Sequence, residues 1–100
     1  MATYKAPIRD MQFVLYELLN GDKLNELPGF EEATRDLIDP VMDAAATFSE
    51  EVIFPINRSG DEEGCKLENG EVTTPAGFKE AYKQFCEGGW STFACDPNYG

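Results

Sequence analysis

The chain has 100 residues, the size of one small domain, which excludes a second globular domain. Its 8 basic and 19 acidic residues give a net charge of −11, which repels phosphate backbones and anionic membrane surfaces, so nucleic acid is not expected as a partner. Hydrophobic residues make up 42% of the chain, which is more than a disordered protein contains.

The first predicted element is a helix over residues 7–19. Pro7 suits its first position, where a backbone N–H would have no partner in the helix. Asn20-Gly21 ends a pattern of apolar residues spaced three and four apart, namely Ile8, Met11, Val14, Leu15, Leu18 and Leu19. Phe13 and Tyr16 lie off this stripe and indicate a second apolar contact. Because so short a helix is marginal in water, we expect it to pack against another element.

The longest periodic segment predicts a second helix over residues 33–54. Pro40 leaves two alternatives for its start. If the helix begins near Thr34, Pro40 removes an internal hydrogen bond and bends the helix at 39–40; if it begins at Asp39, that residue is the N-cap. We favour the bent helix, ended by Pro55 and the Ser59-Gly60 pair.

The remaining signals predict a short hairpin-like loop at 65–73 and a third helix. Asn69-Gly70 is a typical two-residue hairpin turn between very short strands at 65–67 and 72–73. The third helix spans residues 75–87, begins at Thr74-Pro75 and stops at Gly88-Gly89. The expected fold is therefore all-α, with three main helices at 7–19, 33–54 and 75–87.

Few residues carry chemistry. The chain has no histidine, so Cys–His nucleophiles, Ser–His–Asp triads and the usual zinc sites are absent. The three cysteines, Cys65, Cys86 and Cys95, are expected to be reduced thiols that pack as small core residues. Oxygen-bearing side chains from Asn57 to Glu68 have the spacing of a calcium loop, but Glu62 replaces its required glycine, so we interpret them as a solvated acidic loop.

Two further patterns concern location and acid–base chemistry. The longest apolar run, residues 52–56, is far too short to span a bilayer, and no secretory signal is visible, so we expect a cytoplasmic protein without membrane insertion. Paired carboxylates such as Glu31/Glu32 are interpreted as polar helix faces. We therefore expect no catalytic, cofactor-binding or metal-ligating residue in this chain.

Several segments, in order, nevertheless resemble the acyl-CoA dehydrogenase family. They are YKAPIRDMQFVL at 4–15, EEVIFPINRSGD at 50–61, TTPAGFKEAY at 73–82, GGW at 88–90 and DPNYG at 96–100. The likeness covers nearly the whole chain and is strongest to the 3-methylmercaptopropionyl-CoA dehydrogenase type. It implies that residues 1–29 form an N-terminal extension helix and linker, and that residues 30–100 begin the helical N-terminal domain of a longer enzyme.

The resemblance also implies an activity for that longer enzyme. Members of the family bind FAD and oxidise an acyl-CoA thioester to the 2,3-enoyl-CoA, using a glutamate base, an electron-transfer acceptor and usually a homo-oligomeric assembly. The glutamate and the main FAD contacts lie downstream of the matched region, so this stretch alone is expected to be inactive and to bind no FAD. Tyr99 and Gly100 correspond to a segment near the acyl pocket and are the only substrate-proximal candidates. The alternative is a free-standing acidic helical module that binds a partner protein.

Overall fold

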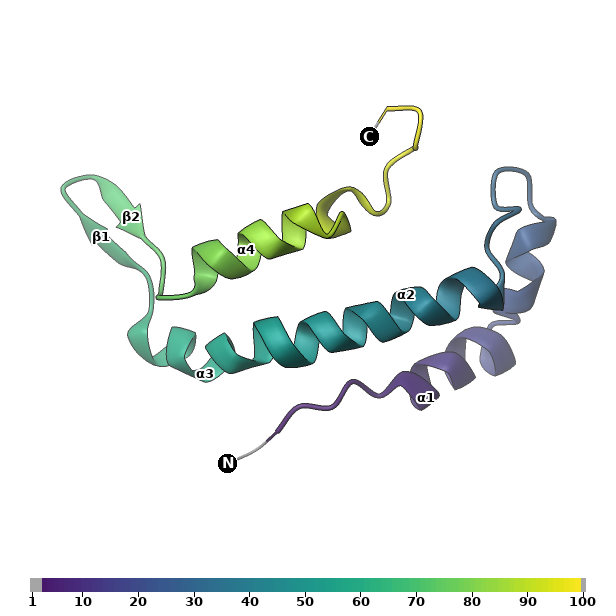
Figure 1. Ribbon diagram of the computed structural model, residues 1–100, viewed down its shortest axis with the longest axis horizontal. Helices are drawn as coiled ribbons and strands as arrows, with labels where there is room; N and C mark the ends of the chain where they lie inside the picture. Colours follow the sequence, from purple (N-terminus) through teal and green to yellow (C-terminus); the bar gives the residue numbers. More distant parts are fainter. Residues whose placement is uncertain (1–2, 100) are drawn as a thin grey trace. The chain divides into compact units, whose positions relative to one another are not determined.

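The computed structural model describes residues 3–99 and divides the chain into two compact units, Met1–Glu51 and Val52–Gly100. Both are mainly helical, and the strands of the described residues form one two-stranded hairpin in the second unit (Figure 1). This confirms the all-α expectation with its short hairpin-like loop. Over residues 3–99, no helix combines the length and the apolar character that crossing a bilayer would require.

The first unit begins with a helix that changes its hydrogen-bonding pattern. An α-helical turn, α1 (Ile8–Gln12), passes into a π-helical segment, η1 (Phe13–Leu18). The π pattern ends with the N–H of Leu19 donating to the carbonyl of Val14 at 2.9 Å. The predicted helix at 7–19 is therefore confirmed to within one residue at each end, but Pro7 is its N-cap and not its first residue.

The N-terminal segment packs on the long helix of the same unit, as expected for a helix too short to stand alone. A 3-10 segment, η2 (Gly21–Glu26), leads to α2 (Arg35–Phe48), and α1 contacts α2. Near the other end of α2, the N–H of Ala6 donates to Oε1 of Glu50 at 2.9 Å. Lys5 Nζ lies 3.8 Å from Oε2 of the same carboxylate.

Helix α2 settles the two alternatives for its start. Thr34 is the N-cap and Pro40 lies inside the helix, so a start at Asp39 is wrong; a bend at 39–40 stays a prediction. The expected end at residue 54 is also wrong, because the π-helical segment η3 (Ser49–Ile53) and then α3 (Phe54–Glu63) follow in the sequence. Proline normally clashes with the carbonyl four residues earlier, and the wider π turn just before Pro55 relieves that clash.

The hairpin of the second unit follows its turn signal. Strands β1 (Lys66–Glu68) and β2 (Glu71–Thr73) are antiparallel, with Leu67 opposite Val72. Asn69 and Gly70 both have positive φ, 52° and 80°, as a type I′ turn requires. The prediction of a hairpin at 65–73 is confirmed.

Helix α4 (Phe78–Glu87) starts three residues later than predicted and ends where predicted. Its N-cap, Gly77, has a φ of 89°, so the chain turns sharply after Pro75 before the helix begins. At the other end the N–H of Gly88 donates to the carbonyl of Gln84 at 2.9 Å, and a short 3-10 segment, η4 (Trp90–Thr92), follows.

In the second unit the end of α3 meets the start of α4 at one point, where Gly60 faces Phe78. Gly60 is buried, and a Cβ built on it would lie 2.5 Å from two ring carbons of Phe78. Oε2 of Glu63 accepts a hydrogen bond from the N–H of Ala76 at 3.0 Å. The buried hydrophobic residue of this unit among those described is Ala81.

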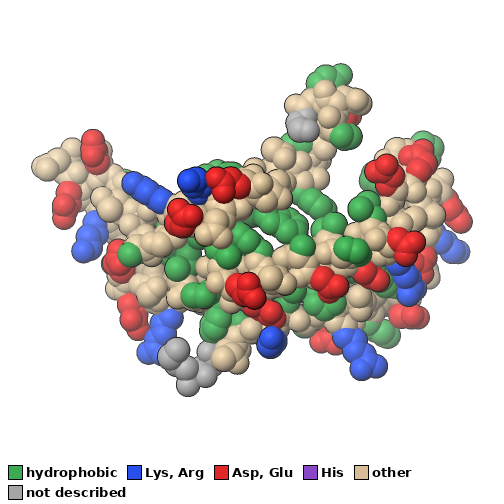
Figure 2. Space-filling view, viewed as in Figure 1, with side chains coloured by type: hydrophobic (Ala, Val, Ile, Leu, Met, Phe, Trp, Pro, Cys, Tyr) green, Lys and Arg blue, Asp and Glu red, His purple; other side chains and the backbone are tan. Residues whose placement is uncertain are grey.

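Much apolar surface stays uncovered. Among the described residues only Tyr16 and Ala81 are buried hydrophobics, whereas many large apolar side chains are exposed and appear between acidic side chains in Figure 2. All three cysteines are exposed too, so their expected place in a core is wrong. Cys65 and Cys95 lie in connecting segments and Cys86 near the end of α4, where little of the chain covers them.

Candidate functional site

The sequence-predicted substrate-proximal residues lie at the end of the chain. Tyr99 is 92% exposed. Its N–H donates to the carbonyl of Asp96 at 2.9 Å, and the N–H of Asn98 donates to Oδ1 of Asp96 at 2.8 Å, so the backbone forms a tight turn there. Gly100 lies outside the described residues. The structure therefore gives the Tyr99 side chain no enclosing pocket.

The residues with calcium-loop spacing are not in one loop. Asn57 and Glu63 lie in α3, and Glu68 is the last residue of β1. Among residues 3–99 no group of three or more cysteine, aspartate or glutamate side chains is placed to hold a metal ion. Helix geometry directs the acidic residues of α3 outward around its axis, which is the solvated arrangement.

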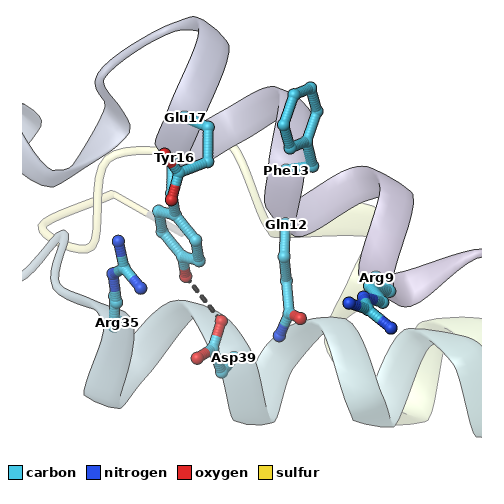
Figure 3. A pocket seen from close by; sticks show the side chains of 7 residues that line it. All are labelled: Arg9, Gln12, Phe13, Tyr16, Glu17, Arg35 and Asp39. Atoms are coloured by element: carbon cyan, nitrogen blue, oxygen red, sulfur yellow. Dashed lines mark hydrogen bonds between the residues drawn. The ribbon is translucent and has the colours of Figure 1, made fainter.

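The most organised polar group lies between the N-terminal helix and α2 in the first unit (Figure 3). It borders a pocket of about 250 Å³. The pocket is lined by five residues of the N-terminal helix and two of α2, namely Arg9, Gln12, Phe13, Tyr16, Glu17, Arg35 and Asp39. Its volume is below that of typical small-molecule sites, about 300–1,000 Å³.

Tyr16 is the centre of this group. Its side chain is only 6% exposed, and its hydroxyl donates to Oδ1 of Asp39 at 2.5 Å. Figure 3 shows the phenol reaching from η1 toward α2, with Arg35 beside its ring. The guanidinium carbon of Arg35 lies 4.1 Å from the ring centroid, a cation–π contact. The predicted second contact of the N-terminal helix is thus made by Tyr16, through its hydroxyl as well as its ring.

Arg35 joins a third element to the same group. Its Nε donates to Oδ1 of Asp22 at 2.7 Å and its Nη2 donates to Oδ2 at 2.6 Å. This two-point geometry matches the planar guanidinium to the carboxylate and fixes its direction. We call Tyr16, Asp22, Arg35 and Asp39 the Tyr16 cluster; it links η1 and η2 to the first turns of α2.

The charges of the Tyr16 cluster are set by these contacts. Burial raises the pKa of Tyr16 to about 12, and the hydrogen bond to Asp39 and the charge of that carboxylate act in the same direction. The hydrogen bond from Arg35 holds the pKa of Asp22 below its ordinary value, and the same pairing raises the pKa of Arg35. At neutral pH the phenol is therefore neutral, while Arg35 and Asp22 form an ion pair.

This arrangement does not favour catalysis. A general acid or base works best with a pKa near the operating pH, and the pKa of Tyr16 is far above it. The guanidinium of Arg35 is already engaged by Asp22 and is not available to hold an anion. The Tyr16 cluster therefore acts as a structural link between elements.

A second, apolar hollow lies on another side of the same helix. It has a volume of about 370 Å³ and is lined by Asp10, Met11, Val14, Leu15 and Leu19, all of them from the N-terminal segment. The four apolar residues of this lining, Met11, Val14, Leu15 and Leu19, belong to the stripe from which the helix was predicted. No residue of α2 takes part in this lining.

Sequence reasoning found the members of the Tyr16 cluster only in part. It placed Tyr16 off the main apolar stripe and considered Asp39 as an N-cap, but it did not pair them. Neither Asp22 nor Arg35 was a candidate site residue. No local signal connects Tyr16 with Asp39, because the partners are 23 residues apart in the sequence.

The Asp22–Arg35 pair predicts a pH dependence of stability. Because the pKa of Asp22 is lowered in the folded chain, the folded state holds the carboxylate charge more firmly than the unfolded state. Its contribution is complete above the ordinary pKa of 3.8 and is lost as the pH falls through the lowered value. We expect Asp22→Asn to make the free energy of unfolding less dependent on pH in the acidic range, measured by urea unfolding at several pH values.

The control for this prediction is Asp43→Asn, an exposed aspartate of α2. It should leave the acidic pH dependence closer to that of the parent chain. If Asp22→Asn and Asp43→Asn change the pH dependence equally, the ion pair with Arg35 has no specific role in it.

Comparison with known proteins gives two relatives. The chain is 35% identical over 98 residues, which are 98% of its length, to 3-methylmercaptopropionyl-CoA dehydrogenase of Ruegeria pomeroyi. It is 33% identical over 90 residues, or 86% of its length, to butyryl-CoA dehydrogenase of Syntrophomonas wolfei. It spans 17% and 15% of the lengths of these relatives. No family model matches the chain.

Proposed function

This chain is homologous over nearly its whole length to acyl-CoA dehydrogenases, and we propose that it is the N-terminal part of such an enzyme. The whole protein would oxidise an acyl-CoA thioester to the 2,3-enoyl-CoA with FAD as cofactor. The observation that carries the proposal is 35% identity extending over 98% of the chain. A second relative, 33% identical over 86% of the chain, supports it.

The exposed apolar surface supports the idea that this stretch works within a larger protein. A folded chain normally covers most of its large apolar side chains, and large exposed patches mark surfaces that bind something else. Here Leu18, Phe93, Leu67 and others stay exposed, and the two relatives are about six times as long as the chain. We infer that the stretch packs against other parts of the enzyme and helps to close its acyl-CoA cavity.

In this proposal the chain itself has two parts. Residues 1–29 are an N-terminal extension and linker, and residues 30–100 begin the helical N-terminal domain. Tyr99 and Gly100 lead toward the acyl pocket, and the exposed Tyr99 side chain is free to contact other parts of the enzyme. The partners of the whole enzyme would be an acyl-CoA, an electron acceptor and further copies of itself, in the cytoplasm.

FAD does not fit the residues described here. A flavin dinucleotide needs a long pocket and donors for its pyrophosphate, commonly a glycine-rich loop before a helix. The polar pocket of the first unit has a volume of only about 250 Å³, and the charge of Arg35 beside it is already paired with Asp22. We therefore place flavin binding, and the catalytic glutamate, in the rest of the enzyme.

The proposal is tested on the full-length protein produced from the gene whose reading frame contains this chain. Its absorbance is scanned for oxidised flavin, and butyryl-CoA and 3-methylmercaptopropionyl-CoA are added anaerobically. We expect bound flavin that is bleached by at least one thioester, because two electrons pass from the substrate to the flavin. The matching 2,3-enoyl-CoA is the control, since it has already lost those electrons and should not bleach.

Two results would contradict the proposal. One is a full-length protein that contains no flavin and takes up none from added FAD. The other is a bound flavin that no saturated acyl-CoA of a graded chain-length series reduces. The first result would favour the alternative, an acidic helical module that binds a partner protein.

A further inference from the structure

The N-terminal helix of the first unit, α1 and η1 together, has two unlike sides. One carries Gln12 and Tyr16, which line the polar pocket together with Arg35 and Asp39 of α2. The other carries the apolar stripe, of which Ile8 and Leu15 are half-buried, Met11 and Val14 are each 43% exposed, and Leu18 and Leu19 are each 65% exposed. An amphipathic surface helix normally turns its apolar side toward the body of its unit. Here the best-buried side chain, Tyr16, lies on the polar side.

Polar contacts join residues 6–22 to α2, and to Glu50 just after α2, at successive points. Counted along the segment, Ala6 bonds to Glu50, Tyr16 to Asp39, and Asp22 to Arg35. The partners run in opposite directions, as in an antiparallel helical hairpin. Of these three bonds, Tyr16–Asp39 is the one made from within α1 and η1, and its direction defines which side of the N-terminal helix faces α2.

The π-helical segment contributes to this orientation. A π turn contains more residues than an α turn, so it changes the direction of the side chains that follow it. Tyr16 lies within η1, and its hydroxyl reaches Asp39 from there. The single-period α-helix expected from the apolar spacing would instead centre the contact on the stripe of Met11, Val14 and Leu18.

We propose that the Tyr16 cluster is an orientation device, which holds the polar side of the N-terminal helix against α2 and keeps the apolar stripe turned away from it. Its main effect is to select between two orientations of the helix, one with the polar side against α2 and one with the apolar stripe against α2. In the other, the stripe would cover the half-buried apolar residues of α2, such as Ile38 and Met42. Polar groups that select one arrangement over another are known from other helical proteins. The inference concerns this chain alone and does not depend on the proposed enzyme function.

The test measures which side of the helix is accessible. In a chain with Cys65→Ser, Cys86→Ser and Cys95→Ser, a single cysteine is introduced either at Leu18, on the stripe, or at Gln12, on the polar side. The rate of thiol labelling is measured for each. In the parent background we expect position 18 to react faster than position 12, because Leu18 is 65% exposed and Gln12 is half-buried.

The Tyr16 cluster is then removed with Tyr16→Leu and Asp39→Leu together. If the cluster orients the helix, the helix turns over and the ratio of the two rates, position 18 to position 12, falls by about tenfold or more. The matched control is Lys23→Leu with Asp36→Leu. It adds the same apolar residues at exposed positions that do not line the polar pocket, and it should leave the ratio unchanged.

The other outcomes also decide the question. If both positions become fast and equal while the rest of the chain keeps its helical circular dichroism, the cluster only attaches the helix, and the proposal is overturned. An unchanged ratio overturns it as well. If the double variant loses its helical signal, Tyr16→Phe replaces it, because it removes only the hydroxyl; the ratio should still fall, and a ratio equal to that of the parent contradicts the proposal.

Discussion

Replacing Tyr16 with alanine should lower the free energy of unfolding of the chain by about 3–5 kcal/mol, the range found for large buried aromatic side chains replaced by alanine. The side chain is only 6% exposed, and the substitution removes its packing as well as the donor to Asp39. Arg35 also loses the ring that its guanidinium covers. The change would be measured by urea unfolding followed by circular dichroism, with amide exchange of residues 8–18 as a local probe.

The matched control is Phe13→Ala in the same helical segment. Phe13 is exposed, and Figure 3 shows its ring directed away from α2. Surface substitutions usually change stability by no more than about 0.5 kcal/mol, so this variant should stay close to the parent chain. Equal losses for Tyr16→Ala and Phe13→Ala would mean that the contact with α2 does not hold the first unit together.

In the second unit, Gly60→Val should cost about 1–3 kcal/mol, because the added side chain meets the ring of Phe78. Even a single Cβ at this position would lie 2.5 Å from two ring carbons, well inside van der Waals contact. The ring of Phe78 must then move away from α3. Urea unfolding measures the loss, and amide exchange in α4 shows where it acts.

Two further variants separate this clash from helix propensity. Ser59→Val places the same branched residue at the exposed neighbouring position of α3, where only a few tenths of a kcal/mol are expected. Phe78→Ala removes the ring, so adding Gly60→Val to it should cost less than adding it to the parent chain. If the cost of Gly60→Val is the same with and without the ring, contact with Phe78 is not its cause.

Local signals predicted what depends on local geometry. Asn69-Gly70 predicted the hairpin correctly, because both residues take the positive φ that the turn requires. The end of α4 was equally clear, since Gly88 and Gly89 follow Glu87 directly. These parts of the fold need no information from distant residues.

Other parts of the fold depend on hydrogen-bonding patterns that apolar spacing does not reveal. Pro55 predicts a stop because proline disrupts an ordinary α-helix. The chain avoids the clash with a π turn over Ser49–Ile53, and the helical structure goes on to Glu63. The start of α4 was placed too early for a related reason, because Pro75 begins a turn that only ends at Gly77.

The Tyr16 cluster could not be predicted, because its members are brought together by tertiary structure. Apolar spacing placed the contact on the stripe of Met11 and Val14, yet the buried residue is Tyr16. Its position depends on the π turn and on an acceptor, Asp39, that the sequence offers equally well as an N-cap. The resemblance to acyl-CoA dehydrogenases, in contrast, is confirmed by two relatives that are 35% and 33% identical over most of the chain, because several segments in order carry more information than any single pattern.

The charges at the hairpin and in the first unit have opposite consequences in salt solution. Glu68 and Glu71 are directly paired across β1 and β2, so two like charges lie side by side next to the turn. In the first unit Arg35 and Asp22 are opposite charges, and both are partly exposed. At physiological ionic strength screening acts over about 8 Å and weakens repulsion and attraction alike. Added salt should therefore weaken the Glu68–Glu71 repulsion in the second unit and the Arg35–Asp22 attraction in the first. The relative stability of the two units thus depends on the ionic strength as well as on the sequence.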